Sequence, residues 1–313
     1  MRILVLGAGG TGGYFGGRLA QSGADVAFLV RPARAATLAR DGLRLRSPLG
    51  DADIPVRCVT AGDAPALAAQ RPFDLVLLSC KAYDLDAAID AVAPVVGPGT
   101  AVLPILNGLR HYAPLDARFG PGRVIGGLCF ISATQAPDGS IRHHTRAASI
   151  TFGERDGDPD SARCRAFAAL CEAAGIRHLH APDIAAEQWS KFTFLATLAA
   201  ATCLMRTDVG GLVATDGGAD FVRALYAETL VAADAAGRPV PAAAQETALR
   251  QLTEPGSPMK ASMLHDLEAG RRVEAAHIVG DMLARVRAAG ADAPRLAAAW
   301  CHLQAYERTL PAA

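Results

Sequence analysis

MRILVLGAGGTG, residues 1–12, is the stretch of this chain that most directly predicts its fold class. Ile3–Leu6 is a continuous apolar run of the kind that forms a buried parallel strand. The residues that follow fit G-x-G-x-x-G and lead into a helical pattern. Gly7 permits a tight turn, Gly9 lets the backbone approach a pyrophosphate, and Gly12 lets the helix pack on the strand. Because a helix N-terminus also favours an anion, the segment predicts a dinucleotide-binding site. The alternative is an accidental glycine-rich turn.

The same alternation of strand and helix continues through the first half of the chain. Further apolar runs are predicted as strands at Val26–Val30, Asp74–Ser79 and Ala101–Leu106. Helical patterns lie between them at Tyr14–Ser22, Ala33–Arg40 and Leu85–Val92. This order predicts a doubly wound α/β sheet of the Rossmann type. Later runs are predicted as antiparallel additions at Val124–Ser132, His143–Thr145 and Ser149–Phe152, with a turn at Asp138-Gly139.

The pattern changes at about Pro182, where strand signals disappear. Long apolar patterns with a 3.6-residue period occupy Ile184–Met205, Ala219–Ala236, Ala242–Leu252, Ala275–Ala289 and Pro294–Thr309. We therefore predict two domains, a Rossmann-type domain at residues 1–181 and an all-helical domain at residues 182–313.

Composition narrows the class of protein. The 313 residues carry 31 basic and 31 acidic side chains, a formal net charge of zero. No excess cation is available to neutralise phosphates, which argues against a nucleic-acid partner and against an anionic membrane surface. The seven cysteines include no C-x-x-C pair, which favours buried free thiols in a reducing compartment and argues against a zinc site.

The apolar stretches do not have the pattern of a signal peptide or of a membrane-spanning helix. The first ten residues pass from a short apolar run straight into glycines, which is typical of a buried strand rather than of a signal peptide. The most apolar later stretch, Phe192–Met205, is shorter than the about 20 residues that span a bilayer. We therefore expect a cytoplasmic protein.

The end of the second predicted strand selects the dinucleotide. An NAD site places Asp or Glu about 20 residues after the glycines, where it binds the ribose 2′-hydroxyl. Here the strand DVAFLV ends in Arg31, with Arg34 one turn later, and Asp25 stands at the wrong end. Two guanidinium groups suit a 2′-phosphate, so NADPH is the predicted cofactor. The alternative is that both arginines are ordinary solvated side chains.

Two rare residue types follow predicted strands. Lysine occurs three times among 31 basic residues, and Asn107 is the single asparagine. Lys81 and Asn107 each follow a strand at its carboxyl end, where ligands bind in open α/β sheets. Both are candidate contacts to the nicotinamide half of the cofactor or to the substrate. Alternatively, Lys81 is a helix-entry charge and Asn107 forms a turn with Gly108.

Lys191 lies near the start of the first long helix after residue 182. Reduction of a carbonyl by hydride generates an alkoxide, which needs a proton donor within hydrogen-bond reach. A partly desolvated lysine ammonium can serve, because burial lowers its pKa towards the working pH. Further on, Glu274 can orient an ammonium group and Ser262 can hydrogen-bond a carboxylate. The alternatives are a solvated helix lysine and a charged loop between helices; Lys260, in the same segment, has no predicted role.

Together these features resemble the ketopantoate reductase (2-dehydropantoate 2-reductase) family over nearly the whole chain. The residues that carry the resemblance are GAGGTG at 7–12, Arg31, Lys81–Tyr83, Asn107-Gly108, Trp189–Lys191 and the segment from Lys260 to Glu274. The resemblance implies an NADP-binding Rossmann domain and a helical domain related to that of 6-phosphogluconate dehydrogenase. The cofactor contacts it implies, together with those predicted above, are Gly7, Ala8, Gly9, Gly10, Thr11, Gly12, Arg31, Lys81 and Asn107.

The resemblance also implies a reaction. It makes Lys191 the proton donor, with Glu274 and Ser262 lining the substrate site. From these residues we predict NADPH-dependent reduction of a 2-oxo acid, with 2-dehydropantoate reduced to pantoate in pantothenate biosynthesis as the first choice. Glu274 is predicted to position Lys191, and Ser262 with Asn107 to orient the substrate. The helical domain is compatible with a homodimer.

Three positions depart from the family pattern. The family carries asparagines one and two turns after its catalytic lysine and another near the position of Gly210, where this chain has Leu195, Ala199 and Val209. Loss of hydrogen-bonding groups is expected to change which acid a site accepts. Two alternatives therefore stay open: a reductase of a more apolar oxo acid, and a non-catalytic dinucleotide-binding sensor.

Overall fold

The first strand of the chain lies at the centre of a five-stranded parallel sheet. The structure, a computed structural model, describes residues 1–311. The strand order is β5-β2-β1-β6-β7. Its members are β1 (Arg2–Leu6), β2 (Asp25–Leu29), β5 (Arg57–Val59), β6 (Leu75–Leu78) and β7 (Ala101–Pro104). Every pairing is parallel. The order runs outward from β1 in both directions, which is the doubly wound arrangement predicted for this half of the chain.

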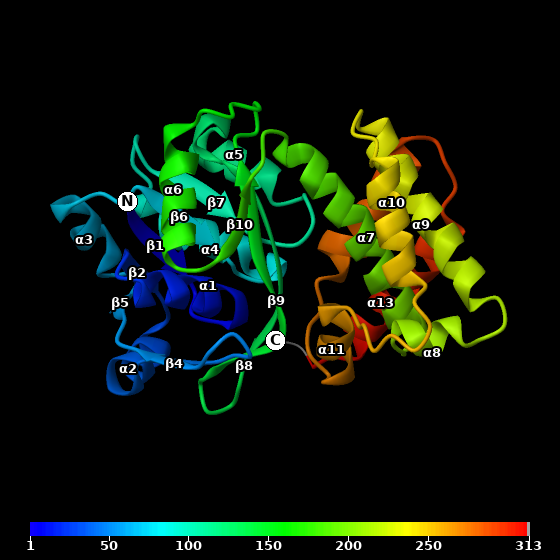
Figure 1. Cartoon of the computed structure of the whole chain (residues 1–313), viewed down its shortest axis with the longest axis horizontal. Coiled ribbons are helices and arrows are strands. Elements are labelled where there is room, and N and C mark those ends of the chain that lie inside the picture. Colours follow the sequence, from blue (N-terminus) through cyan, green and yellow to red (C-terminus); the bar gives the residue numbers. More distant parts are fainter. Residues whose placement is uncertain (312–313) are drawn as a thin grey trace. The chain divides into compact units, whose positions relative to one another are not determined.

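Helices accompany this sheet in the first half of the chain (Figure 1). They are α1 (Gly10–Gln21), α2 (Pro32–Asp41), α3 (Ala64–Gln70), α4 (Leu85–Val92), α5 (Tyr112–Phe119) and α6 (Ala162–Ala173). Strands buried on both faces read as continuous apolar runs, and Ile3, Leu4 and Val5 of β1 are indeed fully buried. Short or weakly apolar elements such as α3 and β5 were not predicted, because their periodicity is too brief to detect.

The later strands form a second sheet, which corrects the prediction of additions to the first. Its order is β10-β9-β3-β4, with β8 also paired to β9. The bounds are β3 (Leu43–Arg46), β4 (Ala52–Ile54), β8 (Gly126–Gln135), β9 (Ile141–Gly153) and β10 (Arg177–His180). β8 and β9 are antiparallel as predicted, but β9 pairs in parallel with β3 and β10. The runs predicted at His143–Thr145 and Ser149–Phe152 are parts of the single strand β9.

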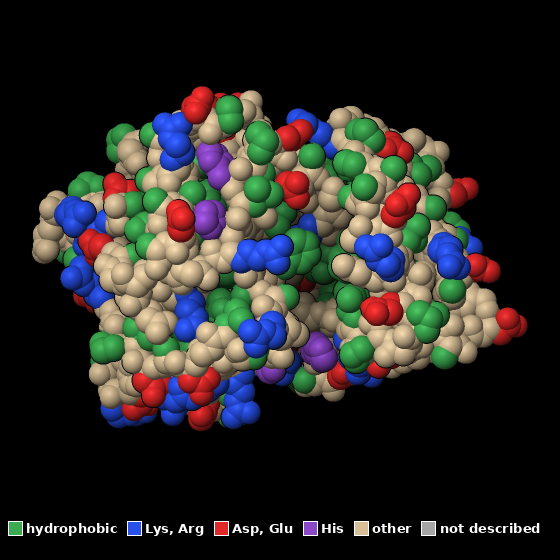
Figure 2. Space-filling view, in the orientation of Figure 1, with side chains coloured by type: hydrophobic (Ala, Val, Ile, Leu, Met, Phe, Trp, Pro, Cys, Tyr) green, Lys and Arg blue, Asp and Glu red, His purple; other side chains and the backbone are tan. Residues whose placement is uncertain are grey.

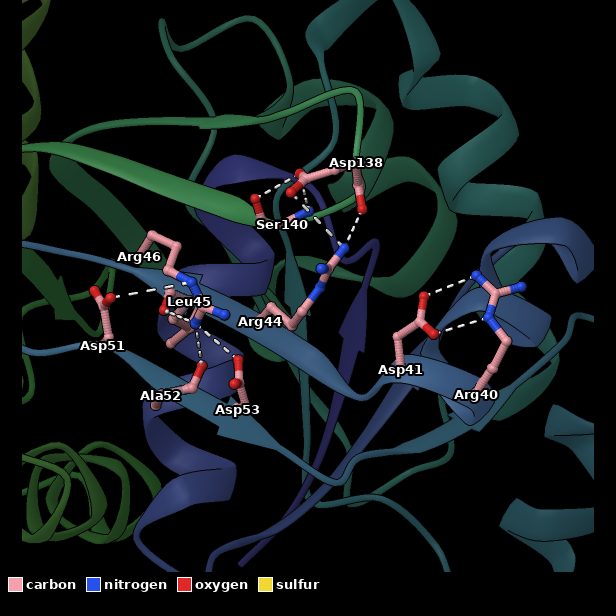
Figure 3. Close-up of polar contacts among 10 residues, drawn as sticks. All are labelled: Arg40, Asp41, Arg44, Leu45, Arg46, Asp51, Ala52, Asp53, Asp138 and Ser140. Carbon is pink, nitrogen blue, oxygen red and sulfur yellow. Dashed lines mark hydrogen bonds and ion pairs between the residues drawn. The ribbon is translucent and has the colours of Figure 1, made fainter.

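The β8–β9 turn is held by the outward-facing side of β3 (Figure 3). β3 reads LRLR, and both of its leucines are fully buried. Arg44 donates to the carbonyl of Asp138 at the turn and pairs with that residue's carboxylate at 3.9 Å. Arg46 pairs with Asp53 of β4 at 2.7 Å. Alternation along β3 therefore gives one apolar face and one face of ion pairs.

The chain divides into two compact units. The first comprises Met1–Leu106 and His111–Ile184; the second comprises Asn107–Arg110 and the chain from Ala185 onward. The helices assigned to the second half are α7 (Ile184–Met205), α8 (Val209–Val213), α9 (Gly218–Ala235), α10 (Ala242–Leu252), α11 (Ser262–Glu268), α12 (Asp281–Ala288) and α13 (Pro294–Thr309). A parallel sheet followed by helices confirms the predicted fold class. Within residues 1–311, no helix is long and apolar enough to cross a membrane.

Two details of the helical part differ from prediction. The run predicted as one helix at Ala275–Ala289 is a π-helical stretch, Ala276–Gly280, followed by α12. The segment interpreted as a charged loop contains α11. Both are short or irregular elements that the surrounding core stabilises, since Met263, Leu264 and Ile278 are almost fully buried. Amphipathic periodicity alone cannot separate a π-helical turn from the α-helix beside it.

Candidate active site

The glycine-rich segment after β1 has the geometry that an anion site needs. Gly7 adopts a φ of 87°, which favours glycine, so the chain turns sharply as it leaves the strand. Gly9 is the N-cap of α1, no side chain caps the helix, and its first turn contains no acidic residue. The N–H groups and positive end of the helix dipole at α1 are therefore not met by a side-chain carboxylate.

Two glycines in this segment have opposite surroundings. A Cβ placed at Gly12 would lie 2.6 Å from the carbonyl oxygen of Gly7 and would collide with Ser79 after β6, so the close approach requires glycine. A Cβ at Gly9 would meet nothing within 4 Å, so space is open on that side of the helix N-terminus. The segment is therefore tightly packed around Gly12 and open beside Gly9. This arrangement fits a pyrophosphate on the first turn of α1.

The two arginines after β2 have different environments. Arg31 is exposed and is the N-cap residue of α2. Arg34 is partly buried, and its Nη2 donates to the carbonyl oxygen of Ala8 at 3.1 Å. Burial lowers the pKa of the Arg34 guanidinium from its ordinary value. Arg34 is therefore tied to the glycine-rich segment, whereas Arg31 presents its charge to solvent at the end of β2. The hydrogen bond from Arg34 to Ala8 was not predicted, because the two residues are far apart in the sequence and no local pattern links them.

Lys81 follows the carboxyl end of β6, three residues after Leu78, as predicted. It is the N-cap of a 3-10 turn, Ala82–Asp84, and its carbonyl accepts a hydrogen bond from the N–H of Asp84 at 2.9 Å. The side chain is partly buried. In a parallel sheet, Lys81 and the glycine-rich segment both follow the carboxyl ends of adjacent strands, β6 and β1.

In the second unit the structure brings together Lys191 and Asn107, which are 84 residues apart in sequence. The Nζ of Lys191 donates to the Oδ1 of Asn107 at 3.3 Å. Lys191 lies on α7 and is partly buried, as is Asn107. A lysine ammonium held by an amide oxygen has a defined direction, which a solvated helix lysine lacks.

The loop of Asn107 packs against the segment that carries Glu274. Gly108 has a φ of 77°, and a Cβ at this position would lie 2.6 Å from the carbonyl oxygen of His277. The N–H groups of His277 and Ile278 both donate to the carbonyl oxygen of Glu274. Glu274 itself is 6% exposed. Gly108 therefore lets one loop approach both α7 and the turn that leads into the π-helical stretch.

The remaining predicted substrate residues lie in contrasting places. Ser262 is exposed, is the first residue of α11, and forms no side-chain hydrogen bond within residues 1–311. Of the three departures from the family pattern, Ala199 and Val209 are buried in the helical core, at 0% and 2% exposure. Leu195, one turn after Lys191, is partly buried.

Sequence reasoning missed two features of this region. The first is the contact between Gly108 and His277, and the second is the π-helical stretch that begins two residues after Glu274. The pair Asn107-Gly108 was a turn signal, but nothing in the sequence said what the turn would pack against. Short π-helical stretches occur frequently at functional sites, so this one is consistent with the candidate residues around it.

Comparison with known proteins identifies the family. The ketopantoate reductase PanE/ApbA model matches residues 3–157, and the corresponding C-terminal model matches residues 183–307. The chain is 34% identical over 307 residues to the uncharacterized oxidoreductase YkpB of Bacillus subtilis, covering 98% of this chain and 99% of that protein.

Solved structures show the same fold over the full length. The 2-dehydropantoate 2-reductase of Geobacter metallireducens superposes with a TM-score of 0.87 at 29% identity, covering 97% of this chain and 99% of that one. The ternary structure of D-mandelate dehydrogenase with NADH and anilino(oxo)acetate gives a TM-score of 0.86 at 19% identity, covering 99% of each chain, and this likeness concerns the fold alone. With both family models matched in order along it, the chain belongs to the ketopantoate reductase family and is an oxidoreductase of that family.

Proposed function

We propose that this chain catalyses NADPH-dependent reduction of a 2-oxo acid to a 2-hydroxy acid, with 2-dehydropantoate as substrate and pantoate as product. The observation that carries the proposal is the hydrogen bond from the Nζ of Lys191 to the Oδ1 of Asn107 at 3.3 Å. A fixed, partly buried ammonium group is the proton donor that carbonyl reduction requires. The family assignment supports an oxidoreductase built around it.

Each candidate residue has a role in this proposal. A bound nicotinamide supplies the hydride to the ketone carbon. Lys191 gives a proton to the oxygen that was the ketone, and Asn107 holds the ammonium group in place. Glu274 positions Lys191, and Ser262 together with Asn107 orients the substrate. The residues that hold the cofactor are Gly7, Ala8, Gly9, Gly10, Thr11, Gly12, Arg31, Lys81 and Asn107.

A more apolar 2-oxo acid is the second candidate substrate. The observation that favours it is Leu195, which replaces a polar residue of the family pattern one turn after Lys191 and is only partly buried. Ala199 and Val209 support it less, because both are enclosed in the helical core. A protein of the same fold, D-mandelate dehydrogenase, has been solved in a ternary structure with NADH and anilino(oxo)acetate, so this scaffold holds an aromatic oxo-substituted acetate in at least one case.

NADPH oxidation by the purified protein tests these candidates directly. The panel contains 2-dehydropantoate, a branched aliphatic 2-oxo acid, an aromatic 2-oxo acid and a control without substrate, each with NADPH and with NADH. Turnover of 2-dehydropantoate with the highest kcat/KM supports the first proposal. Turnover confined to the apolar acids overturns that substrate and supports the second.

A pair of lysine variants separates an enzyme from a non-catalytic sensor. Lys191→Ala is expected to lower kcat by about 100-fold or more, because general acid catalysis contributes about that much, while NADPH binding is retained. Lys260→Ala is the matched control, since the Nζ of Lys260 pairs with the Oε1 of Glu268 at 2.8 Å and has no proposed role. NADPH binding without turnover of any acid by the wild-type protein supports the sensor instead.

The division of labour along the chain is also a proposal. We infer that residues 1–181 hold the dinucleotide and that residues 182–313 provide the substrate-binding and catalytic groups. The structural units divide near this boundary but assign Asn107–Arg110 to the second unit. The cytoplasmic location and the homodimer stay predictions.

A further inference from the structure

A pocket of about 530 Å³ lies in the first unit and is lined by none of the residues proposed for catalysis. The part of α1 from Tyr14 onward, the middle of β9, the connection from α6 to β10 and Leu49 surround it. It is lined by Tyr14, Arg18, Gln21, Ser22, Leu49, Arg146, Ala147, Ala148, Ser149, Ala173, Ala174, Gly175, Ile176 and Arg177. Its volume falls within the range of about 300–1,000 Å³ that is usual for small-molecule sites.

The charged side chains that line this pocket are all positive. Three arginines line it, namely Arg18, Arg146 and Arg177, and no aspartate or glutamate does. Within residues 1–311, none of the three pairs with a carboxylate. In Figure 2, blue side chains surround a green area over α1 and β9. By contrast, the three arginines drawn in Figure 3, Arg40, Arg44 and Arg46, each pair with an aspartate. A chain of zero net charge thus leaves three positive charges without a carboxylate partner around one pocket.

Two of these guanidinium groups are held in place by backbone carbonyls of one loop. Arg18 donates from Nη2 to the carbonyl oxygen of Gly50 at 2.5 Å and from Nη1 to the Oε1 of Gln21 at 2.9 Å. Arg146 donates from Nη1 to the carbonyl oxygen of Pro48 at 3.2 Å. A guanidinium has five N–H donors, so these bonds orient the group and leave donors available. Preorganised donors lose less entropy when a ligand binds.

Stabilisation of helix C-termini by cations does not explain all three arginines of this pocket. Arg18 lies in the last turn of α1, where a cation is favourable. Arg146 and Arg177, however, come from β9 and β10, outside any helix. The carbonyls at the end of α6 are already engaged, because the N–H groups of Gly175 and Ile176 bond back to that helix. Stability at helix ends therefore explains one arginine of three.

The pocket is also separate from the proposed dinucleotide site. Its part of α1 runs from Tyr14 to Gln21, whereas the glycine-rich segment precedes the first turn. A helix rises about 1.5 Å per residue, so the span from Gly10 to Gln21 places the two ends about 17 Å apart. Arg18, the pocket arginine on α1, lies in its last turn and so stands well apart from a phosphate on the first turn.

We propose that this pocket is a second binding site, for a small phosphate-bearing anion with at least two negative charges. Arginine forks match phosphate oxygens in pairs, and three of them around one pocket suit a ligand with more than one such group. Ser22, Ser149 and Gln21 add polar groups at its wall. The site does not depend on the proposed reductase function, because none of its lining residues is among those proposed to bind cofactor or substrate.

Titration calorimetry with inorganic pyrophosphate on the full chain tests the site. The test variants are Arg146→Gln and Arg177→Gln, each of which removes one pocket charge. Arg142→Gln is the matched control: it removes an equal charge from the same strand, β9, at an exposed residue that does not line the pocket. A second titration of the wild type in saturating NADPH and NADH reports on the glycine-rich segment, the other place where pyrophosphate can bind.

The expected result is that each test variant weakens pyrophosphate binding by about 10-fold or more, since a hydrogen bond to a charged group contributes about that factor. Arg142→Gln, and the wild type saturated with the dinucleotides, are expected to bind pyrophosphate as the free wild type does. The proposal is overturned if wild-type protein does not bind pyrophosphate. It is equally overturned if Arg142→Gln weakens binding as much as the test variants, or if a saturating dinucleotide abolishes it.

Discussion

At the scale of single residues, Arg31 and Arg34 are two similar side chains in different environments. Both follow β2, but Arg34 is partly buried and bonded to the carbonyl of Ala8, while Arg31 is exposed. A group that holds the glycine-rich segment affects any dinucleotide. A group that offers only its charge affects a ligand that carries an extra phosphate there. The two positions therefore predict different changes in cofactor affinity.

Arg31→Ala is expected to weaken NADPH binding by about 10-fold and to leave NADH binding unchanged, because a lost charge-assisted hydrogen bond costs about 1.5–3 kcal/mol. Arg34→Ala is expected to weaken both cofactors. Fluorescence titration with each cofactor measures this, with Arg40→Ala as control, since Arg40 is an exposed residue of α2 paired with Asp41. Equal loss of NADPH and NADH in Arg31→Ala would contradict the predicted reading of a 2′-phosphate.

Gly108 supports a second prediction at this scale. Gly108→Ala is expected to destabilise the protein by about 2–3 kcal/mol, because alanine is strained at a φ of 77° and its Cβ would lie 2.6 Å from the carbonyl oxygen of His277. Gly290→Ala is the matched control, because Gly290 has the same φ of 77° with nothing within 4 Å. Urea unfolding of both variants separates the two contributions. A loss in Gly290→Ala as large as in Gly108→Ala would remove the contact with His277 from the explanation.

At the scale of elements, the N-cap residue of α6 is hydrogen-bonded to the buried carboxylate of Glu154. The Oγ of Ser161, its N-cap residue, accepts from the N–H of Cys164 at 3.3 Å and donates to the Oε1 of Glu154 at 2.5 Å. Arg163 donates two hydrogen bonds of 2.6 Å to the same carboxylate, from Nε and Nη2. Burial alone would raise the pKa of Glu154, but its hydrogen bonds to Arg163 and Ser161 outweigh burial, so the pKa lies below its ordinary value.

This lowered pKa fixes the pH dependence of the helix start. A carboxyl whose folded-state pKa is lowered stabilises the fold above its unfolded pKa of about 4.5, and the effect is lost as the pH falls through the folded value. Arg163→Gln is expected to cost about 1–2 kcal/mol at pH 7, discounted for the partial exposure of Arg163, and progressively less below about pH 4. Arg165→Gln, which breaks the exposed pair with Asp160 on the same helix, is the control and is expected to change little.

Urea unfolding of these two α6 variants at pH 7 and at pH 3.5 gives the comparison. A loss in Arg163→Gln that is the same at both pH values would mean that Glu154 does not titrate through its contact with Arg163.

At the scale of the whole molecule, the cysteines report on burial across both halves of the chain. All seven lie in the described residues and none forms a disulfide. Burial raises the pKa of Cys164 to about 11 and the pKa of Cys171 and Cys203 to about 12. Cys301 is the exposed one. Because the thiolate is the reactive form, exposure and pKa both predict a wide spread of reactivity.

With Ellman's reagent at pH 8, the native protein is expected to react first at Cys301, and Cys301→Ser is expected to remove this fast phase. The buried thiols are expected to react only as the chain unfolds, so the number of reactive thiols should rise together across the urea transition. Fast modification of Cys171 or Cys203 in the native protein, located by mass spectrometry, would contradict the burial of either core.

The parts of the fold predicted from sequence are those with strong local signals. The long helix α7 begins and ends where its periodicity predicted, and β1 lies in its apolar run. The second sheet was not predicted, because β3 and β10 are four residues each and pair with β9, about 100 residues from β3 in the chain. Short amphipathic strands take their stability from distant partners, which local patterns do not reveal.

The glycine-rich turn, the order of strands and helices, and the rare side chains proposed to bind a dinucleotide and to donate a proton were all predictable from the sequence. These follow from local backbone preferences and from the chemistry of single residues. The contact of Asn107 with Lys191, the packing of Gly108 on His277, and the three arginines around a pocket without an acid were visible in the tertiary structure alone. Such contacts join segments far apart in the chain, and they form because burial of each core fixes where those segments meet.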